Sequence, residues 1–182
     1  MHIVGITGTS WAGKGTVVEI LISQYGYQHY GVSEYLSQEL KKQGLAVDRQ
    51  HLIDLANQLR SKHGNWAIVQ LLYQQAKKQG GNAIIESLRS VWEVQELQKN
   101  ADFILLAVDA DPQTRYQRIL QRKSAKDQIS RETFLQQEHS EMQNTDPNKQ
   151  NIQACMDLAN YHINNDGTLE ELKAQIQTLF DH

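Results

Sequence analysis

The chain has 182 residues, of which 40% are hydrophobic, so it is long and apolar enough to form the core of one domain. Its formal net charge of −3 gives no overall field that would attract nucleic acid, and no nucleic-acid partner is expected. The sequence has no long apolar span, no signal-peptide core and only one cysteine, Cys155, so we expect a cytoplasmic monomer or homodimer that contacts no membrane and has no internal disulfide.

The N-terminal segment predicts a phosphate-binding loop. Residues 2–7 form an apolar run typical of a buried strand, and residues 17–22 repeat apolar residues at helical spacing. Between them, Gly8 and Gly13 allow tight turns close to an anion, the amides of the new helix point at phosphates, and Lys14 adds a mobile positive charge. The expected nucleotide-binding residues are Gly8, Thr9, Ser10, Trp11, Ala12, Gly13, Lys14, Gly15 and Thr16.

The end of this loop departs from the usual pattern. Gly15 stands where Ser or Thr normally binds magnesium, and the hydroxyl comes one residue later, at Thr16. We therefore expect the nucleotide's phosphates and water to hold Mg²⁺. The ending Gly-Lys-Gly-Thr resembles that of nucleoside monophosphate kinases of the adenylate and cytidylate type, whereas dephospho-coenzyme A kinases usually carry Gly-Lys-Ser-Thr. The resemblance implies ATP and Mg²⁺ as cofactors and a small nucleotide-type acceptor.

Strands and helices alternate along the rest of the chain. Further strands are expected at residues 28–32, 82–86, 103–109 and 161–163. Helices are expected at residues 34–43, 48–62 and 123–142, after Asn65, after Asp111-Pro112, and after the capping boxes of Ser90 with Glu93 and Thr168 with Glu171, with Ser33 capping the first of these. This order predicts a three-layer α/β/α P-loop fold with a parallel five-stranded sheet and right-handed crossovers. By resemblance, residues 1–182 form a single kinase domain with a helical acceptor-binding insert at about 33–80 and a lid at about 123–145.

The third strand ends in Glu86-Ser87-Leu88-Arg89. In nucleoside monophosphate kinases this place holds an acidic residue and then an Arg that grips the acceptor phosphate. The resemblance assigns Arg89 to the acceptor phosphate and to catalysis, and it assigns Glu86 to acceptor binding and to magnesium through water. The alternative is a plain ion pair between Glu86 and Arg89.

The expected insert carries the other acceptor candidates. Residues 32–36 resemble the start of the family's acceptor-binding helix, which makes Glu34 a candidate acceptor contact. The family often has an Arg just beyond, and Ser37 stands there instead. Arg60, which precedes Gly64, is the candidate replacement, and its alternative role is one exposed charge on an amphipathic helix.

An arginine stripe follows the fourth strand. The spacing of Arg115, Arg118 and Arg122 puts all three on one helical face. Arg118 and Arg122 match the arginine pair that precedes the lid in nucleotide kinases, so the resemblance makes them catalytic; Arg115 and the lid residue Arg131 are weaker candidates. The alternative is a solvated helix face. Near the C-terminus, Asn165, Gly167 and Thr168 resemble the turn that backs onto the donor base, with Gly167 binding through its main chain.

Three functions stay open from the sequence. The first is transfer of the γ-phosphoryl group of ATP to a (deoxy)nucleoside monophosphate, with charge stabilised by Lys14, Arg89, Arg118 and Arg122 and no covalent intermediate. The second is phosphorylation of the 3′-hydroxyl of dephospho-coenzyme A. The third is a non-catalytic nucleotide-binding regulator or an ATPase, which the missing arginine at Ser37 keeps open. The scattered histidines show no metal-ligand spacing, so no zinc site is expected.

Overall fold

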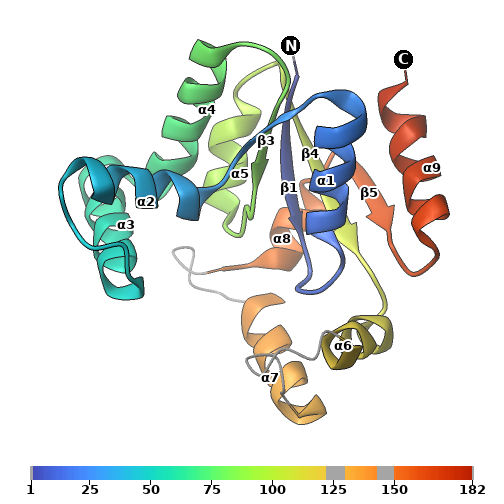
Figure 1. Cartoon of the computed structure of the whole chain (residues 1–182). Helices are drawn as coiled ribbons and strands as arrows, with labels where there is room; N and C mark the ends of the chain where they lie inside the picture. Colours follow the sequence, from blue (N-terminus) through green and yellow to red (C-terminus); the bar gives the residue numbers. More distant parts are fainter. Residues whose placement is uncertain (1, 122–129, 143–149, 182) are drawn as a thin grey trace.

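A computed structural model describes residues 2–121, 130–142 and 150–181. Its centre is one five-stranded parallel sheet with the order β2-β3-β1-β4-β5 (Figure 1). The strands are β1 (Ile3–Gly8), β2 (Gln28–Tyr30), β3 (Ala83–Glu86), β4 (Phe103–Asp109) and β5 (Tyr161–Asn164). All carboxyl ends of the strands therefore lie on the same edge of the sheet, where ligands bind in open α/β folds.

The described helices occupy the connections and the C-terminus. They are α1 (Lys14–Tyr25), α2 (Val32–Lys42), α3 (Arg49–His63), α4 (Ala67–Gln79), α5 (Val91–Gln98), α6 (Pro112–Gln121), α7 (Arg131–Met142), α8 (Ile152–Asp157) and α9 (Leu169–Phe180). Helices lie on both faces of the sheet (Figure 1), so the predicted three-layer α/β/α P-loop fold is confirmed.

Each face of the sheet has its own apolar core. On one face, buried residues of α1 and α9, such as Leu21 and Ile176, pack on Ile6 and Leu106 of the central strands. On the other face, residues of α4, α5 and α8 pack on the sheet. β1 is buried along its whole length, which fits a parallel strand covered on both sides.

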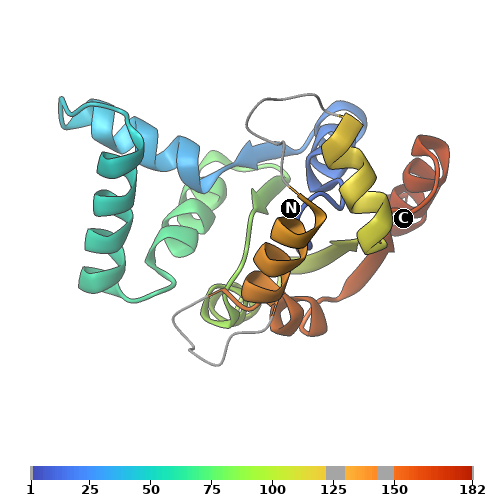
Figure 2. The ribbon, with the colours of Figure 1, turned by 90° about the horizontal axis from the view of Figure 1, so that it is seen from below.

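The other helices lie outside these two layers. α2 and α3 pack against α4 through Leu36, Leu40, Leu55, Ala56 and Ile68 and form an arm beside the sheet. Seen from below in Figure 2, this arm projects to one side, while α6 and α7 lie at the carboxyl edge of the strands. Ile152 and Met156 of α8, with Met142 of α7, connect this edge to Ala107 of β4.

Several helix boundaries differ from the predicted ones. α2 begins at Val32 with Gly31 as its N-cap, so Ser33 lies inside the helix and does not cap it. The N-cap of α4 is Trp66, one residue after the predicted Asn65. The helix predicted at 123–142 starts only at Arg131, because the Ser130 hydroxyl accepts a hydrogen bond from the Thr133 amide as a cap does. The remainder of that predicted helix, 123–129, is outside the described residues.

The helix α8 was not predicted. It has only six residues, and Ile152, Cys155 and Met156 bury its apolar side. Cys155 is completely buried, as expected for a small apolar core residue. Asn151 caps the helix by accepting a hydrogen bond from the Ala154 amide.

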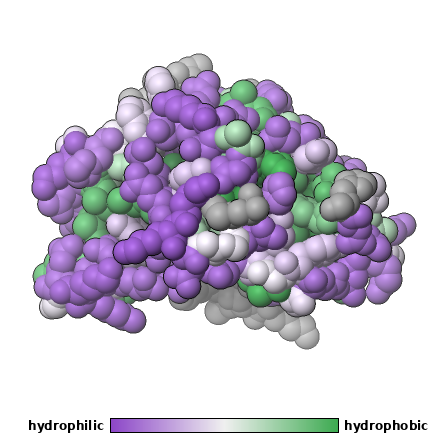
Figure 3. Space-filling model, turned by 90° about the horizontal axis from the view of Figure 1, so that it is seen from above, coloured by the Kyte–Doolittle hydropathy of each residue, from purple (hydrophilic) through white to green (hydrophobic). Residues whose placement is uncertain are grey.

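The outer surface is mainly polar. The face at the amino ends of the strands, seen from above in Figure 3, is largely hydrophilic and carries only small separate hydrophobic groups. Within the described ranges, no helix is both long enough and apolar enough to cross a bilayer. The opposite face of the molecule holds the carboxyl ends of the strands, where ligands bind in open α/β folds, so a functional site is expected there.

Candidate active site

The chain turns tightly between Gly8, the last residue of β1, and Lys14, the first residue of α1, as the sequence predicts for a phosphate-binding loop. Gly8 has a φ of 133°, and a Cβ there would lie 1.9 Å from the carbonyl oxygen of Val108. Gly13 has a φ of 95°, and a Cβ there would lie 2.2 Å from Nδ2 of Asn165. Only glycine fits both positions, and α1 begins directly at Lys14 with no acidic residue in its first turn. The positive end of the α1 dipole therefore meets the loop without a carboxylate of its own.

The Lys14 ammonium group is folded onto this loop. Its Nζ donates hydrogen bonds to the carbonyl oxygens of Gly8, at 2.9 Å, and Thr9, at 2.6 Å. Burial, followed by repulsion from Arg89, lowers the pKa of Lys14 to about 8. An anion placed beside Lys14 would favour the charged form of this side chain.

Packing does not require a glycine at position 15. A Cβ at Gly15 would meet nothing within 4 Å. A serine would fit the same backbone, so its missing hydroxyl is a chemical difference from the usual loop and not a steric one. That the phosphates and water alone hold magnesium stays a prediction.

A carboxylate at the end of β4 holds the first part of the loop. Oδ1 of Asp109 accepts hydrogen bonds from the Thr9 hydroxyl at 2.6 Å and from the Ala110 amide at 2.9 Å. The sequence analysis did not single out Asp109. The signal was present, because Asp109 ends a strand in the same way as Glu86 does.

Arg118 and Asn165 hold the second part of the loop. Arg118 donates to the carbonyl oxygens of Trp11 and Ala12, each at 3.4 Å, and to the carbonyl oxygen of Asn165 at 2.6 Å. The Asn165 side-chain amide, which is buried, donates to the carbonyl oxygen of Ala12 at 2.8 Å. The nearby Thr168 caps α9 together with Glu171, whose carboxylate lies close against Gly167. The loop is thus tied to α6 and to the turn that follows β5.

Trp11 occupies an unusual backbone conformation, with a φ of 68°. Together with Ser10 it lines a cavity of about 140 Å³ whose opposite wall includes Phe134, Glu138 and Glu141 of α7. Trp11 therefore lies on the side of the loop that faces α7.

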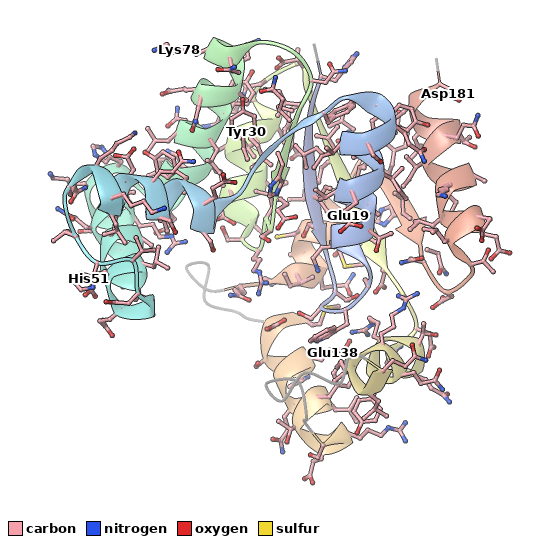
Figure 4. All side chains as sticks on the ribbon, viewed as in Figure 1. Glu19, Tyr30, His51, Lys78, Glu138 and Asp181 are labelled. Atoms are coloured by element: carbon pink, nitrogen blue, oxygen red, sulfur yellow. The ribbon has the colours of Figure 1, made fainter. Side chains whose placement is uncertain are left out.

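The arginine stripe is divided among different partners. Arg115 is only 2% exposed, and it donates to the Ala110 carbonyl and pairs with Glu138. The guanidinium also lies 5.6 Å from the Phe134 ring centroid. Figure 4 shows Glu138 where α7 faces α6. Arg115 is therefore not part of a solvated face, and its hydrogen-bond and ion-pair partners differ from those of Arg118. Arg131 is exposed at the start of α7, and Arg122 lies outside the described residues.

Glu86 and Arg89 do not pair with each other in the described structure. Oε2 of Glu86 lies 3.5 Å from Nε2 of His29, at the end of the neighbouring strand β2. Glu86 raises the pKa of His29 against the effect of burial, and His29 lowers the pKa of Glu86 in turn. Arg89 instead donates to the Gln150 side chain at 3.2 Å and lies 3.9 Å from Oε1 of Glu141. The predicted alternative of a simple Glu86–Arg89 ion pair is wrong, and His29 is a partner that the sequence analysis missed.

The remaining acceptor candidates lie on the arm formed by α2 and α3. Glu34 is exposed in the first turn of α2, and its charge adds to the rise in the pKa of His29. The Ser37 hydroxyl donates to the carbonyl oxygen of Ser33 within α2. Arg60 lies in the last turn of α3 and forms no ion pair with another described residue. That Arg60 replaces the arginine missing at Ser37 stays a prediction.

Comparison with known proteins yields a family match and several similar chains. A family model described as AAA domain matches residues 7–136. A UPF0200 protein of Methanococcus maripaludis is 28% identical over 99% of this chain and 96% of its own length. Among solved structures, TT1252 of Thermus thermophilus has a TM-score of 0.64 and 20% identity over 99% of this chain and 96% of its own. A shikimate kinase of Bacteroides thetaiotaomicron has a TM-score of 0.60 and 12% identity over 100% of this chain and 99% of its own.

Proposed function

Because the chain belongs to the AAA domain family and folds like the P-loop kinases, we propose that it is an ATP- and magnesium-dependent phosphotransferase acting on a small acceptor. The observation that carries the proposal is the phosphate-binding loop with its lysine, opposed by an arginine from another strand end. Arg89, which follows β3, is close enough to Lys14 to lower its pKa, second only to burial. Cations from two strand ends therefore converge on one space, as phosphoryl transfer requires.

The residues of the phosphate-binding loop, which form the donor side of the candidate site, fit a nucleoside triphosphate. The turn that only glycine can make at Gly8 and Gly13 leaves room for phosphates beside the start of α1, and Lys14 would exchange its two carbonyl contacts for phosphate oxygens. Magnesium, when bound, would neutralise charge on the phosphates. Arg118 would keep the loop carbonyls of Trp11 and Ala12 fixed during the reaction. Catalysis would rest on position and charge, without a covalent intermediate.

The first candidate acceptor is a (deoxy)nucleoside monophosphate. Arg89 supports this choice, because its guanidinium is half-exposed and has the forked geometry that binds a phosphate. In this reaction an acceptor phosphate oxygen attacks the γ-phosphorus of ATP, and ADP leaves. The function would be that of a nucleoside monophosphate kinase.

A second candidate is a hydroxyl acceptor, such as the 3′-hydroxyl of dephospho-coenzyme A. The contact of Glu86 with His29 favours it, because it orients a carboxylate at the same edge as Lys14. That carboxylate can accept the proton of the attacking hydroxyl while the bond between the γ-phosphorus and ADP breaks. The lower pKa of Glu86 keeps it ionised at neutral pH.

The deciding experiment measures ADP formation from Mg·ATP with a panel of nucleoside monophosphates, with dephospho-coenzyme A, and without acceptor. The Lys14→Ala protein, prepared in the same way, is the control for contaminating kinases. Turnover that depends on a monophosphate supports the first candidate, and turnover with dephospho-coenzyme A alone supports the second. ADP formed at the same rate without any acceptor would make the protein an ATPase, and ATP binding without ADP formation would make it a regulator.

A further inference from the structure

Glu141, in the last turn of α7, reaches the phosphate-binding loop from a distant part of the chain. Its Oε2 accepts a hydrogen bond from the Ser10 hydroxyl at 2.9 Å. Its Oε1 lies 3.9 Å from the Arg89 guanidinium. The Glu141 side chain is 32% exposed, so it sits at the mouth of the loop and not in the core.

The surroundings of this carboxylate are those of a bound anion. Ser10 offers a hydroxyl donor from the loop itself, and Arg89 offers a cation from the end of β3. Lys14 also senses the negative charge of Glu141, which partly offsets the effects of burial and of Arg89 on the pKa of the lysine. A carboxylate presents charged oxygen acceptors to such groups in the same way as a phosphate does.

We propose that Glu141 is an internal competitor for the phosphate site: its carboxylate engages the Ser10 hydroxyl that the outer phosphates of a nucleotide would take, and it also lies beside the acceptor-side Arg89 guanidinium. The inference rests on the part of the proposed function that concerns phosphate binding at the loop, and it does not depend on the acceptor. A nucleotide gains its contact with the Ser10 hydroxyl only when the carboxylate gives this hydrogen bond up. Displacing Glu141 therefore costs part of the binding free energy, and the apparent affinity for the nucleotide is lower than it would be without this carboxylate.

The helix that carries Glu141 is held by a separate anchor one turn earlier. Glu138 pairs with the buried Arg115, and the Phe134 ring lies against the same guanidinium and against Tyr116. Displacement of the Glu141 carboxylate therefore does not require these contacts to break. α7 can stay on the core while its last turn changes partners from protein to ligand.

A different role for Glu141, holding magnesium for the nucleotide, predicts the opposite effect of removing its charge. A carboxylate that recruits a metal lies among other oxygen ligands, whereas Glu141 lies beside a guanidinium and near an ammonium group. Among the described residues, no three His, Cys, Asp or Glu side chains are grouped as a metal site. The competitor role therefore follows from the local charges, and the sign of one measurement separates the two roles.

The test is calorimetric binding of a non-hydrolysable ATP analogue, with and without Mg²⁺, to the wild type and to Glu141→Gln at pH 7, which is below the pKa of about 8 that Lys14 has in the wild type. Glutamine keeps the size of the side chain and removes its charge, so we expect binding about three- to tenfold tighter, in line with the loss of one charge-assisted contact. Glu132→Gln changes an exposed charge on the first turn of the same helix, in a groove with Leu135 and His139, and should leave binding unchanged. Circular dichroism of both variants checks the fold.

Unchanged binding by Glu141→Gln would overturn the proposal, and weaker binding, confined to the titration with Mg²⁺, would assign Glu141 to the metal. Inorganic tripolyphosphate, titrated in parallel, separates this inference from the proposed function. If tripolyphosphate binds more tightly to Glu141→Gln while no nucleotide binds to either protein, the competitor role stands and the kinase proposal fails. If neither probe binds to either protein, both proposals fail.

Discussion

The donor and acceptor sides of the carboxyl edge are built in different ways. On the donor side, Asp109, Arg118 and Asn165 each bond to the phosphate-binding loop, so contacts with other parts of the fold hold its shape. On the acceptor side, Arg89 contacts Gln150 and Glu141, Glu86 contacts His29, and Arg60 has no ion pair in the described part of the chain. The difference indicates a nucleotide site whose loop backbone is held by other parts of the fold, beside an acceptor site whose side chains pair mainly with one another.

The largest expected effect comes from removing the lysine of the donor side. Lys14→Ala should lower kcat/KM for ATP about a thousandfold, because one preorganised cation is lost where charge develops on the phosphates. The fold should persist, since the Lys14 ammonium bonds only to two carbonyl groups of the loop. Steady-state kinetics with a denaturation curve measure both, and near wild-type turnover would refute the assignment of this loop.

Arg118→Ala should weaken nucleotide binding and leave acceptor binding nearly unchanged. Loss of its contacts with Trp11, Ala12 and Asn165 frees the loop, so affinity for an ATP analogue should fall about thirtyfold, a typical cost for charged hydrogen bonds. The KM for the acceptor should stay within about twofold of the wild-type value, because these contacts all lie on the donor side. An acceptor KM that rises as much as the ATP dissociation constant would show that the two sides are not independent.

Arg89→Lys is the corresponding change on the acceptor side. Lysine keeps the charge and loses the forked contact, so the KM for a monophosphate acceptor should rise about tenfold while the ATP KM changes little. Steady-state kinetics with each substrate varied in turn give both values. An equal rise in the two KM values would place Arg89 on the donor phosphates.

The smallest expected effect is a pH dependence of nucleotide binding. The pKa of Lys14 in the free protein is about 8, and bound phosphates favour its charged form, so binding should weaken as pH rises through 8. Between pH 7 and pH 8.5 the dissociation constant of an ATP analogue should rise about fourfold, as deprotonation of one group near pH 8 requires. Calorimetry over this range measures the change, and Lys14→Ala should show no such rise.

The same lysine has a consequence for folding stability. Its pKa in the folded protein is below that of an unfolded chain, so the unfolded state binds more protons as pH passes through about 8. The free energy of unfolding should therefore gain a favourable contribution from Lys14 as pH increases above 8, opposite in sign to the effect on nucleotide binding.

The fold was largely predictable because its signals are local. Both predicted capping boxes, Ser90 with Glu93 and Thr168 with Glu171, are formed at the starts of α5 and α9. The apolar run of β4 forms a central strand with the predicted bounds. The helix α8 was not predicted because its six residues form fewer than two turns, which is too short for an apolar periodicity to be recognised.

The candidate site was predictable only in part, for a physical reason. Its donor loop is one continuous segment in which spacing alone implies geometry, as with Gly8 and Gly13. The pairing of His29 with Glu86 depends on β2 and β3 being neighbours, although the arm of helices separates them in sequence. Likewise, no sequence pattern in α7 indicates that Glu141 faces the loop, because the apolar residues of that helix do not define a single face.

The single cysteine offers a way to count rare openings of the molecule. Cys155 is fully buried under the sheet, and burial raises the pKa of its thiol to about 12. Because only a thiolate reacts readily with an alkylating reagent, native molecules should be almost inert at neutral pH. Each modified chain then records one opening in which α8 has left the sheet, so the labelling rate reports how often this protein opens under the conditions of the labelling experiment.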